Sequence, residues 1–171
     1  MPQLSSSDGK WFVVQTKSRC EKKVYQQLID AGYQAYLPLQ TTWRVWSDRN
    51  KKVELPLIPS VLFVENPDVN KERIYALSGV YNILNIHGKI GVVRQVEIDH
   101  LRLLCNNDIA WEQVDLVRYQ KGDAVEIKAG AFKGHIATAI EDMNTYRVLL
   151  KIESLGTGFV VNLPKNQVSR I

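Results

Sequence analysis

Residues 129–135, AGAFKGH, combine two glycines with a lysine, residue types that can surround a phosphate group. A phosphate-binding Walker loop needs Gly-x-x-x-x-Gly-Lys-Ser/Thr at the start of a helix, so that backbone amides converge on the anion. Here Lys133 precedes the second glycine, no Ser or Thr follows, and strand patterns flank the stretch. The stretch therefore predicts a tight turn between strands, in which Gly130 and Gly134 supply backbone freedom. Phe132 then either packs inside or forms a surface aromatic.

Other residues that could support catalysis or metal binding are not arranged for it. Cys20 and Cys105 form no CxxC motif, and each falls on an apolar helical stripe, which predicts small core residues. His87, His100 and His135 lack metal-ligand spacing, and no Ser/His/Asp arrangement or nucleotide loop is present. We expect no enzyme, no metal and no cofactor.

The composition is that of an ordinary globular protein. The chain has 171 residues, of which 45% are hydrophobic and 23% charged. No apolar run approaches the length that spans a bilayer, and residues 1–9 read as a polar tail without the order of a signal peptide. We expect a cytoplasmic protein with no membrane contact.

Positive charge is concentrated in the first part of the chain. Residues 1–107 hold fourteen Lys and Arg against ten Asp and Glu, whereas residues 108–171 hold eight of each. A neutral carboxyl-terminal part is poor support for phosphate binding and better support for a protein partner.

Residues 10–106 carry the pattern of an α+β domain, with an antiparallel sheet flanked by helices. Ser18 and Glu21 have capping-box spacing, and an apolar stripe follows until Gly32, which predicts a helix. Residues 41–57 predict a hairpin with a basic tip around the turn residues 47–50. Further strands are expected at 11–16, 33–38, 61–65 and on both sides of Gly88, and further helices at 70–77 and 96–106.

The remaining residues divide into a linker and a small all-β domain. Residues 107–119 have no clear period and are interpreted as the linker. Residues 120–171 contain five short alternating stretches separated by turn signals, which favours a small closed barrel.

These motifs resemble those of the NusG family. KGDAVEIKAGAFKGHIATAIED is similar to the KOW motif, WFVVQTKSRCEKKVYQQL resembles the opening of the NusG amino-terminal (NGN) domain, and LIPSVLFVE resembles the family's Phe-Pro-Gly-Tyr-x-x-Val segment. The motifs occur in the family's order and together span residues 11–171. Ser60 and Val61 depart from that pattern, since glycine and tyrosine are usual there, and the chain looks more like the specialised paralogues RfaH and UpxY.

The resemblance implies a monomeric transcription elongation and antitermination factor, with an NGN domain followed by an SH3-like KOW barrel. Such a factor binds the clamp helices of the largest RNA polymerase subunit, suppresses pausing or termination at particular operons, and contacts non-template DNA. Its barrel recruits a partner such as ribosomal protein S10 or Rho. The target operon, the choice of partner, and a switch of the barrel to a helical autoinhibited state stay open, although the alternating pattern favours strands.

Three sets of candidate site residues follow from the resemblance. The polymerase-binding pocket maps onto Val13, Gln15, Ile58, Val61, Phe63 and Ile86. The nucleic-acid surface maps onto Lys17, Arg19, Lys22, Lys23, Trp43, Arg44, Arg49, Lys51 and Lys52. The partner surface of the barrel maps onto Phe132, Lys133, Tyr146 and Val148.

Each set has a plainer interpretation. The apolar pocket residues can be ordinary core, and a charge run is usually a solvated face.

A ribosome-associated or general RNA-binding KOW protein is the alternative function. It predicts salt-sensitive RNA affinity in the barrel, against which the barrel's zero net charge argues.

Overall fold

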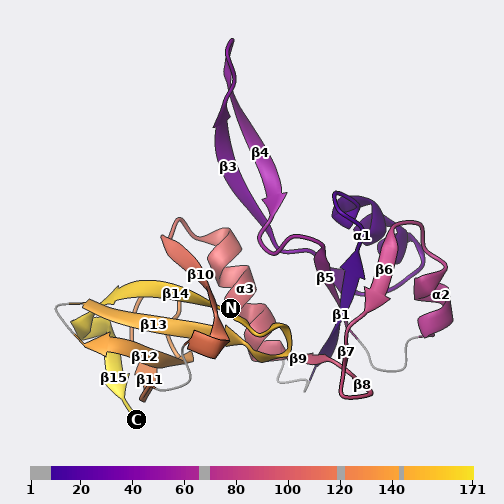
Figure 1. The fold of residues 1–171 in the computed structure, drawn as a ribbon. Coiled ribbons are helices and arrows are strands. Elements are labelled where there is room, and N and C mark those ends of the chain that lie inside the picture. The colour runs from indigo at the N-terminus through magenta and orange to yellow at the C-terminus, as the bar shows by residue number, and fades with distance from the viewer. Residues whose placement is uncertain (1–8, 66–69, 119–121, 143–144) are drawn as a thin grey trace. The chain divides into compact units, whose positions relative to one another are not determined.

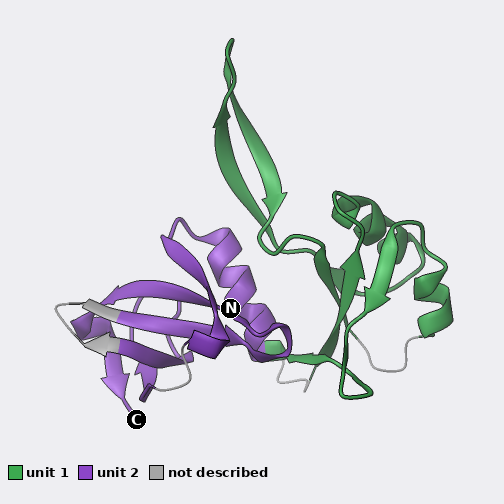
Figure 2. Cartoon of the chain, in the orientation of Figure 1, with its two compact units in different colours: residues 1–95 green, residues 96–171 purple. Residues whose placement is uncertain are grey.

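The computed structural model describes residues 9–65, 70–118, 122–142 and 145–171, and it divides into two compact units. Unit 1 comprises residues 1–95 and unit 2 comprises residues 96–171 (Figure 2). The expected polar tail, apart from Gly9, lies outside the described residues. Among the described helices, none is long and apolar enough to cross a membrane.

Unit 1 is an α+β unit of antiparallel strands and two helices (Figure 1). Its elements are β1 (Lys10–Thr16), α1 (Glu21–Asp30), β2 (Ala35–Tyr36), β3 (Leu39–Val45), β4 (Asn50–Pro56), β5 (Val61–Glu65), α2 (Lys71–Tyr75), β6 (Val80–Ile83), β7 (Asn85–Ile86), β8 (Lys89–Ile90) and β9 (Val92–Arg94). The main sheet has the order β2-β5-β1-β6, and β9 also pairs with β1. The pairs β3–β4 and β7–β8 form separate two-stranded sheets.

One core cluster of unit 1 lies on one face of the main sheet, and further residues are buried on the other face. Alternate β1 residues Phe12 and Val14 belong to a cluster with residues of both helices, as the period-two geometry of a strand requires. The full cluster of buried residues is Phe12, Val14, Val24, Leu28, Leu37, Leu62, Val64, Ile74 and Ile83. The residues between them, such as Val13, therefore face the other side of the sheet.

The predicted start of α1 is wrong, whereas its predicted end is confirmed. Cys20 is the N-cap and makes no side-chain capping bond, so Ser18 and Glu21 form no capping box. At the other end Gly32 has φ +85°, and the amides of Gly32 and Tyr33 donate to the carbonyls of Ile29 and Leu28. This is the left-handed closure that glycine favours.

Unit 2 is dominated by a six-stranded antiparallel sheet of order β10-β14-β13-β12-β11-β15. Its elements are α3 (Gln95–Asn106, in unit 2 from Val96), β10 (Trp111–Asp115), η1 (Leu116–Arg118), β11 (Ala124–Ile127), β12 (Ile136–Asp142), β13 (Thr145–Ile152), η2 (Glu153–Leu155), β14 (Thr157–Pro164), η3 (Lys165–Gln167) and β15 (Val168–Arg170). The five strands expected after residue 120 are all present. Phe159 and Val161 on β14 and Leu150 and Ile152 on β13 are buried.

The division of the chain differs from the expected boundary at residue 106. α3 belongs with the second sheet, because the buried carboxylate of Glu97 accepts a hydrogen bond from the amide of Glu153 at 2.9 Å. The segment expected to be a linker contains β10, which pairs with β14 over Trp111–Asp115. β10 is an edge strand in which only Val114 is buried, so its sequence shows too little alternation to predict a strand.

Candidate binding surfaces

The second face of the main sheet brings together four of the six residues predicted for the polymerase pocket. Val13 lies opposite Phe63, and Gln15 lies opposite Val61, in the antiparallel register of β1 and β5. Because these residues are two apart on each strand, their side chains share one face. Tyr36 on β2 pairs with Phe63, and their rings stack with centroids 6.4 Å apart. Val13, Val61 and Phe63 are buried.

The other two predicted pocket residues lie elsewhere. Ile58 is buried in the segment that joins β4 to β5. Ile86 is on β7, in a separate two-stranded sheet, and is 37% exposed. The structure therefore groups Val13, Gln15, Val61 and Phe63 in one sheet, whereas Ile86 lies in another.

Gln15 places a polar group on this mainly apolar face, and it has a partner. The amide nitrogen of Asn82 donates to the side-chain oxygen of Gln15 at 3.3 Å, and Asn82 accepts in turn from the hydroxyl of Tyr75 at 3.1 Å. Asn82 is the register partner of Gln15 on β6. A side-chain amide that keeps its hydrogen bond costs little binding free energy when an interface buries it, whereas an amide without a partner costs much more. The sequence pointed to neither Asn82 nor Tyr75.

The loop that leads into β5 is held in an unusual conformation. Ser60, which stands where the family usually has glycine, has φ +60°. Its amide donates to the carboxylate of Glu21 at 2.8 Å, and its carbonyl accepts from the amide of Thr16 at 2.9 Å. A left-handed conformation costs a serine about 1 kcal/mol relative to glycine. The buried Glu21 thus fixes the loop beside Val61, a role that the capping-box interpretation concealed.

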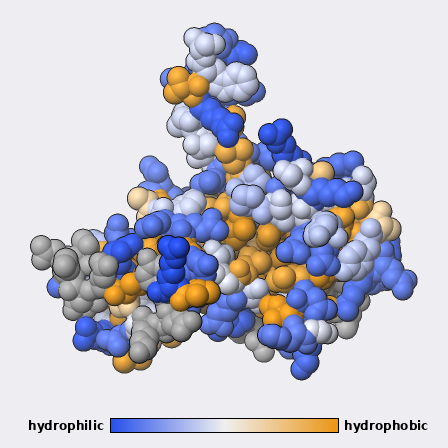
Figure 3. Space-filling model, viewed as in Figure 1, coloured by the Kyte–Doolittle hydropathy of each residue, from blue (hydrophilic) through white to orange (hydrophobic). Residues whose placement is uncertain are grey.

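The basic hairpin predicted at residues 41–57 is confirmed, and it projects from the rest of unit 1 (Figure 1). β3 and β4 pair only with each other, from Leu39 opposite Pro56 to Val45 opposite Asn50. The amide of Trp46 donates to the carbonyl of Arg49 at 2.9 Å and closes the turn. Figure 3 shows hydrophobic and hydrophilic residues mixed over the surface of this hairpin.

The two faces of the hairpin carry different side chains. Directly opposed residues share a face, so Trp43 lies with Lys52, and Arg44 lies with Lys51 on the other side. Trp43 is 68% exposed and Trp46, in the turn, is 58% exposed. Exposed aromatics beside basic residues are the groups that bind unpaired bases and phosphates. Near the turn, one face therefore combines an aromatic side chain with a lysine, whereas the other carries two basic side chains.

A hollow joins the hairpin to α1. It has a volume of about 400 Å³ and is lined by Lys22, Thr41, Lys52 and Glu54. The ammonium of Lys22 lies 3.7 Å from the carboxylate of Glu54, and both side chains are more than half exposed. The two predicted basic clusters thus meet at Lys22 and Lys52. Glu54 was not among the residues singled out in the sequence.

The remaining basic residues contribute less to this surface. Lys23 donates to the hydroxyl of Ser78 at 3.0 Å, so its ammonium is engaged outside the hollow. Lys17 and Arg19 are exposed before α1 begins, and Arg19 has φ +62°. Arg49 lies 3.6 Å from its neighbour Asp48 in the hairpin turn.

The stretch 129–135 forms the predicted turn between β11 and β12. Gly130 and Gly134 have φ +83° and +85°, and the amide of Gly134 donates to the carbonyl of Ile127 at 2.7 Å. Phe132 is only 1% exposed, so of its two predicted locations the interior is correct. The two glycines permit this turn, because they adopt left-handed conformations that other residues avoid.

The partner surface predicted for unit 2 is not assembled as expected. Phe132 and Val148 are buried and do not form a surface that a partner could contact in this conformation. Lys133 is exposed. Tyr146 lies on β13, and its side chain is outside the described residues.

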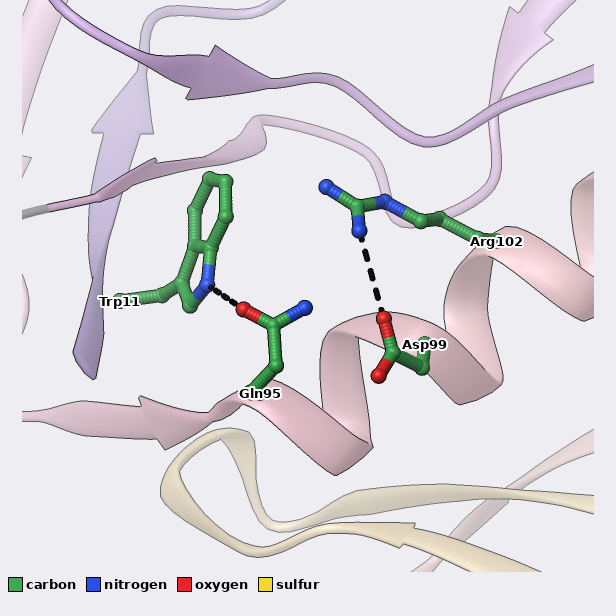
Figure 4. Close-up of polar contacts among 4 residues, drawn as sticks. All are labelled: Trp11, Gln95, Asp99 and Arg102. Carbon is green, nitrogen blue, oxygen red and sulfur yellow. Dashed lines mark hydrogen bonds and ion pairs between the residues drawn. The ribbon is translucent and has the colours of Figure 1, made fainter. Parts of the chain in front are cut away.

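A histidine pair lies where the turn meets α3 within unit 2. The ring centroids of His100 and His135 are 4.9 Å apart. Burial lowers the pKa of His135, and the carboxylate of Asp99 acts in the opposite direction. Asp99 also accepts from Arg102 at 3.3 Å (Figure 4). Among the described residues, no group of three or more His, Cys, Asp and Glu is placed to hold a metal ion.

A polar contact links the end of unit 1 to β1. The indole nitrogen of Trp11 donates to the side-chain oxygen of Gln95 at 2.7 Å (Figure 4). Trp11 is also the register partner of Val93 on β9. The contact ties the last residue of unit 1 to its central strand.

Comparison with known proteins agrees with the fold of unit 1. Residues 9–102, more than half of the chain, match the family described as transcription termination factor NusG. The chain therefore belongs to the NusG family of transcription factors. No curated protein matches the chain.

A solved structure with a TM-score above 0.5 gives the same fold. The structure titled "Domain interaction in Thermotoga maritima NusG" is 21% identical, with a TM-score of 0.52, over 95% of this chain and 97% of that one. The structure titled "Crystal Structure of MjSpt4:Spt5 complex conformation A" is 22% identical, with a TM-score of 0.30, over 94% of this chain and 97% of that one.

Proposed function

We propose that this protein is a specialised transcription elongation and antitermination factor, which binds RNA polymerase through the second face of the main sheet in unit 1. The supporting observation is the grouping of Val13 with Phe63 and of Gln15 with Val61 as adjacent cross-strand pairs. This face carries the hydrogen-bonded amides of Gln15 and Asn82 beside Val13, Val61 and Phe63, which are buried in this conformation, so a helical partner such as the clamp helices of the largest polymerase subunit must uncover the face before it can bind there. Membership of the NusG family supports the same assignment.

The hairpin supplies the second contact of the proposed function. Its strands pair only with each other and carry exposed aromatic and basic side chains. These groups suit the non-template DNA strand that is exposed during transcription, because lysines neutralise phosphates and indole rings stack on unpaired bases. Unit 2, an SH3-like KOW barrel in this proposal, recruits a further partner such as ribosomal protein S10 or Rho.

A paused-elongation assay with purified RNA polymerase tests the polymerase contact. The full chain should shorten the pause, and Gln15→Arg should abolish the effect because it places a charge in the centre of the contact face. The matched control is Ile29→Arg on α1, the helix whose buried side chains pack on the opposite face of the sheet. Circular dichroism melting curves of both variants should match that of the wild type.

Two results would contradict the proposal. One is an equal loss of pause shortening in both variants. The other is a wild type that binds free RNA tightly but leaves the pause unchanged, which would favour the general RNA-binding alternative. That alternative also predicts that affinity resides in unit 2, where Lys and Arg do not outnumber Asp and Glu.

A further inference from the structure

We propose that the hollow between α1 and the hairpin reads an unpaired guanine base of single-stranded DNA. This inference rests on the proposed DNA contact and adds a base preference to it. The hollow combines two ammonium groups, from Lys22 and Lys52, with the carboxylate of Glu54. Its volume of about 400 Å³ has room for a nucleobase.

The carboxylate is the informative group. Glu54 is the only acidic residue on β3 and β4, whose other charged residues are all basic. A site for phosphate alone is weakened by a carboxylate, because like charges repel. A carboxylate at a nucleic-acid surface instead accepts hydrogen bonds from N–H groups of a base. Glu54 therefore indicates recognition of a base edge.

Guanine matches this donor and acceptor pattern. It presents two neighbouring donors, the N1–H and the N2 amino group, which a carboxylate can accept together. Its O6 and N7 are acceptors for lysine ammonium groups. Thymine offers a single N–H between two carbonyl oxygens, and cytosine and adenine each offer one amino group beside a ring nitrogen that carries a lone pair, so none of the three gives a carboxylate two neighbouring donors. Because N1–H is engaged in a duplex, the guanine must be unpaired.

Trp43 provides the stacking surface for this base or its neighbour. The pairs Thr41–Glu54 and Trp43–Lys52 are successive rows on one hairpin face, so the indole lies beside the hollow. Trp43 is largely exposed and Lys52 is its register partner. A base held on the indole would have its edge toward Glu54 and its phosphate near lysine.

The ion pair in the hollow does not oppose binding strongly. Lys22 and Glu54 are 3.7 Å apart, and their side chains are 57% and 61% exposed. Exposed ion pairs of this kind contribute little to stability. A guanine can therefore exchange one weak contact for two directed hydrogen bonds and a stacking contact.

Fluorescence anisotropy of the full chain tests the inference with three short oligodeoxynucleotides. One is all thymidine, one has a single central guanine, and one has hypoxanthine there, which lacks only the N2 amino group. We expect about tenfold tighter binding of the guanine oligomer than of the thymidine oligomer, with hypoxanthine between them, since one bidentate contact gives discrimination of this size. Glu54→Gln should remove the preference without weakening binding of the thymidine oligomer.

Matched variants separate recognition from net charge. Glu72→Gln makes the same charge change at an exposed position on α2 and should keep the preference. Lys52→Ala should reduce the preference, whereas Lys51→Ala, on the opposite hairpin face, should weaken all three oligomers equally.

The inference is overturned if the wild type binds the guanine and thymidine oligomers equally, or if Glu54→Gln and Glu72→Gln behave alike. Its failure is separable from that of the polymerase proposal. A protein that shortens pausing but shows no guanine preference retains the polymerase contact and loses this inference. A protein that shows a guanine preference but does not shorten pausing retains this inference and loses the polymerase contact.

Discussion

Two strand pairs in this molecule hold their aromatic residues in opposite environments. The β3–β4 hairpin in unit 1 has Trp43 on β3 and Trp46 in its turn, and the 129–135 turn in unit 2 has Phe132, each near basic residues. Trp43 and Trp46 are 68% and 58% exposed, whereas Phe132 is 1% exposed. β3 and β4 pair only with each other, but β11 and β12 belong to a six-stranded sheet.

The sheet around a turn thus decides what its aromatic residue does. A two-stranded ribbon has no second layer on which a ring can pack, so its aromatics stay exposed. A turn above a larger sheet can bury its ring, which then stabilises the fold. The two units also differ in charge. Residues 1–95 hold thirteen Lys and Arg against eight Asp and Glu, whereas residues 96–171 hold nine against ten.

The largest expected effect is that of Phe132→Ala. Removing a fully buried phenylalanine costs about 3–5 kcal/mol of unfolding free energy, because transfer energy is lost and a cavity remains. Amide hydrogen exchange read by mass spectrometry should show this loss in the strands of unit 2. Unit 1 should keep its protection, since the two units have separate buried residues.

Phe132→Leu is the conservative control for this substitution. It keeps most of the apolar volume and should cost clearly less than alanine. If Phe132→Ala left exchange in β13 and β14 unchanged, Phe132 would not be a core residue, and the contrast between the two turns would fail.

A smaller effect is expected from pH, through His135 beside the same turn. Its pKa is lowered by burial, with Asp99 opposing, so the unfolded chain binds more protons than the folded one just below its ordinary pKa of 6.5. The stability of unit 2 is then fully present above about pH 6.5 and falls as the pH drops through the lower folded value. Hydrogen exchange at pH 7.5 and at more acidic pH measures this change.

His135→Gln is the variant that isolates this contribution. It should flatten the pH dependence of unit 2 and leave that of unit 1 as it was. A pH dependence of unit 2 that is identical in the wild type and in His135→Gln would show that another group is responsible. His100, whose ring lies 4.9 Å from that of His135 by centroids, would then be the next residue to replace.

The sequence predicted the strands well because most of them alternate clearly. The hairpin, β5 and the strands β11 to β15 each show a period of two or a continuous apolar run between turn residues. Helices α2 and α3 were also expected near their observed positions. In these segments local pattern and tertiary packing agree.

The site residues were harder to predict, because their roles depend on contacts between distant residues. Glu21 fits a capping box by spacing, yet its carboxylate binds the amide of Ser60, thirty-nine positions away. In the sequence Glu54 is one of many charged residues, and only the fold shows that it lies beside Lys22. The affiliation of α3 with unit 2 depends similarly on Glu97 and Glu153. Spacing alone does not carry such information.

The smallest expected effect on stability, and the sharpest test of the contrast, is that of Trp43→Ala. An exposed aromatic on a two-stranded ribbon buries little surface, so the free energy of unfolding of unit 1 should change by about 0.5 kcal/mol or less. Affinity for single-stranded DNA should nevertheless fall by roughly tenfold, because stacking of a base on an aromatic ring contributes about 1–3 kcal/mol. Urea denaturation and anisotropy on the same samples measure both quantities.

Trp43→Phe keeps a stacking ring and should retain most of the affinity, which separates stacking from a general disturbance of the hairpin. Trp11→Phe provides the opposite control, since Trp11 is buried and donates to Gln95, so stability should fall there. If Trp43→Ala instead destabilised unit 1 as much as Trp11→Phe, the hairpin aromatics would be structural. The two turns would then differ only in the place where their rings pack.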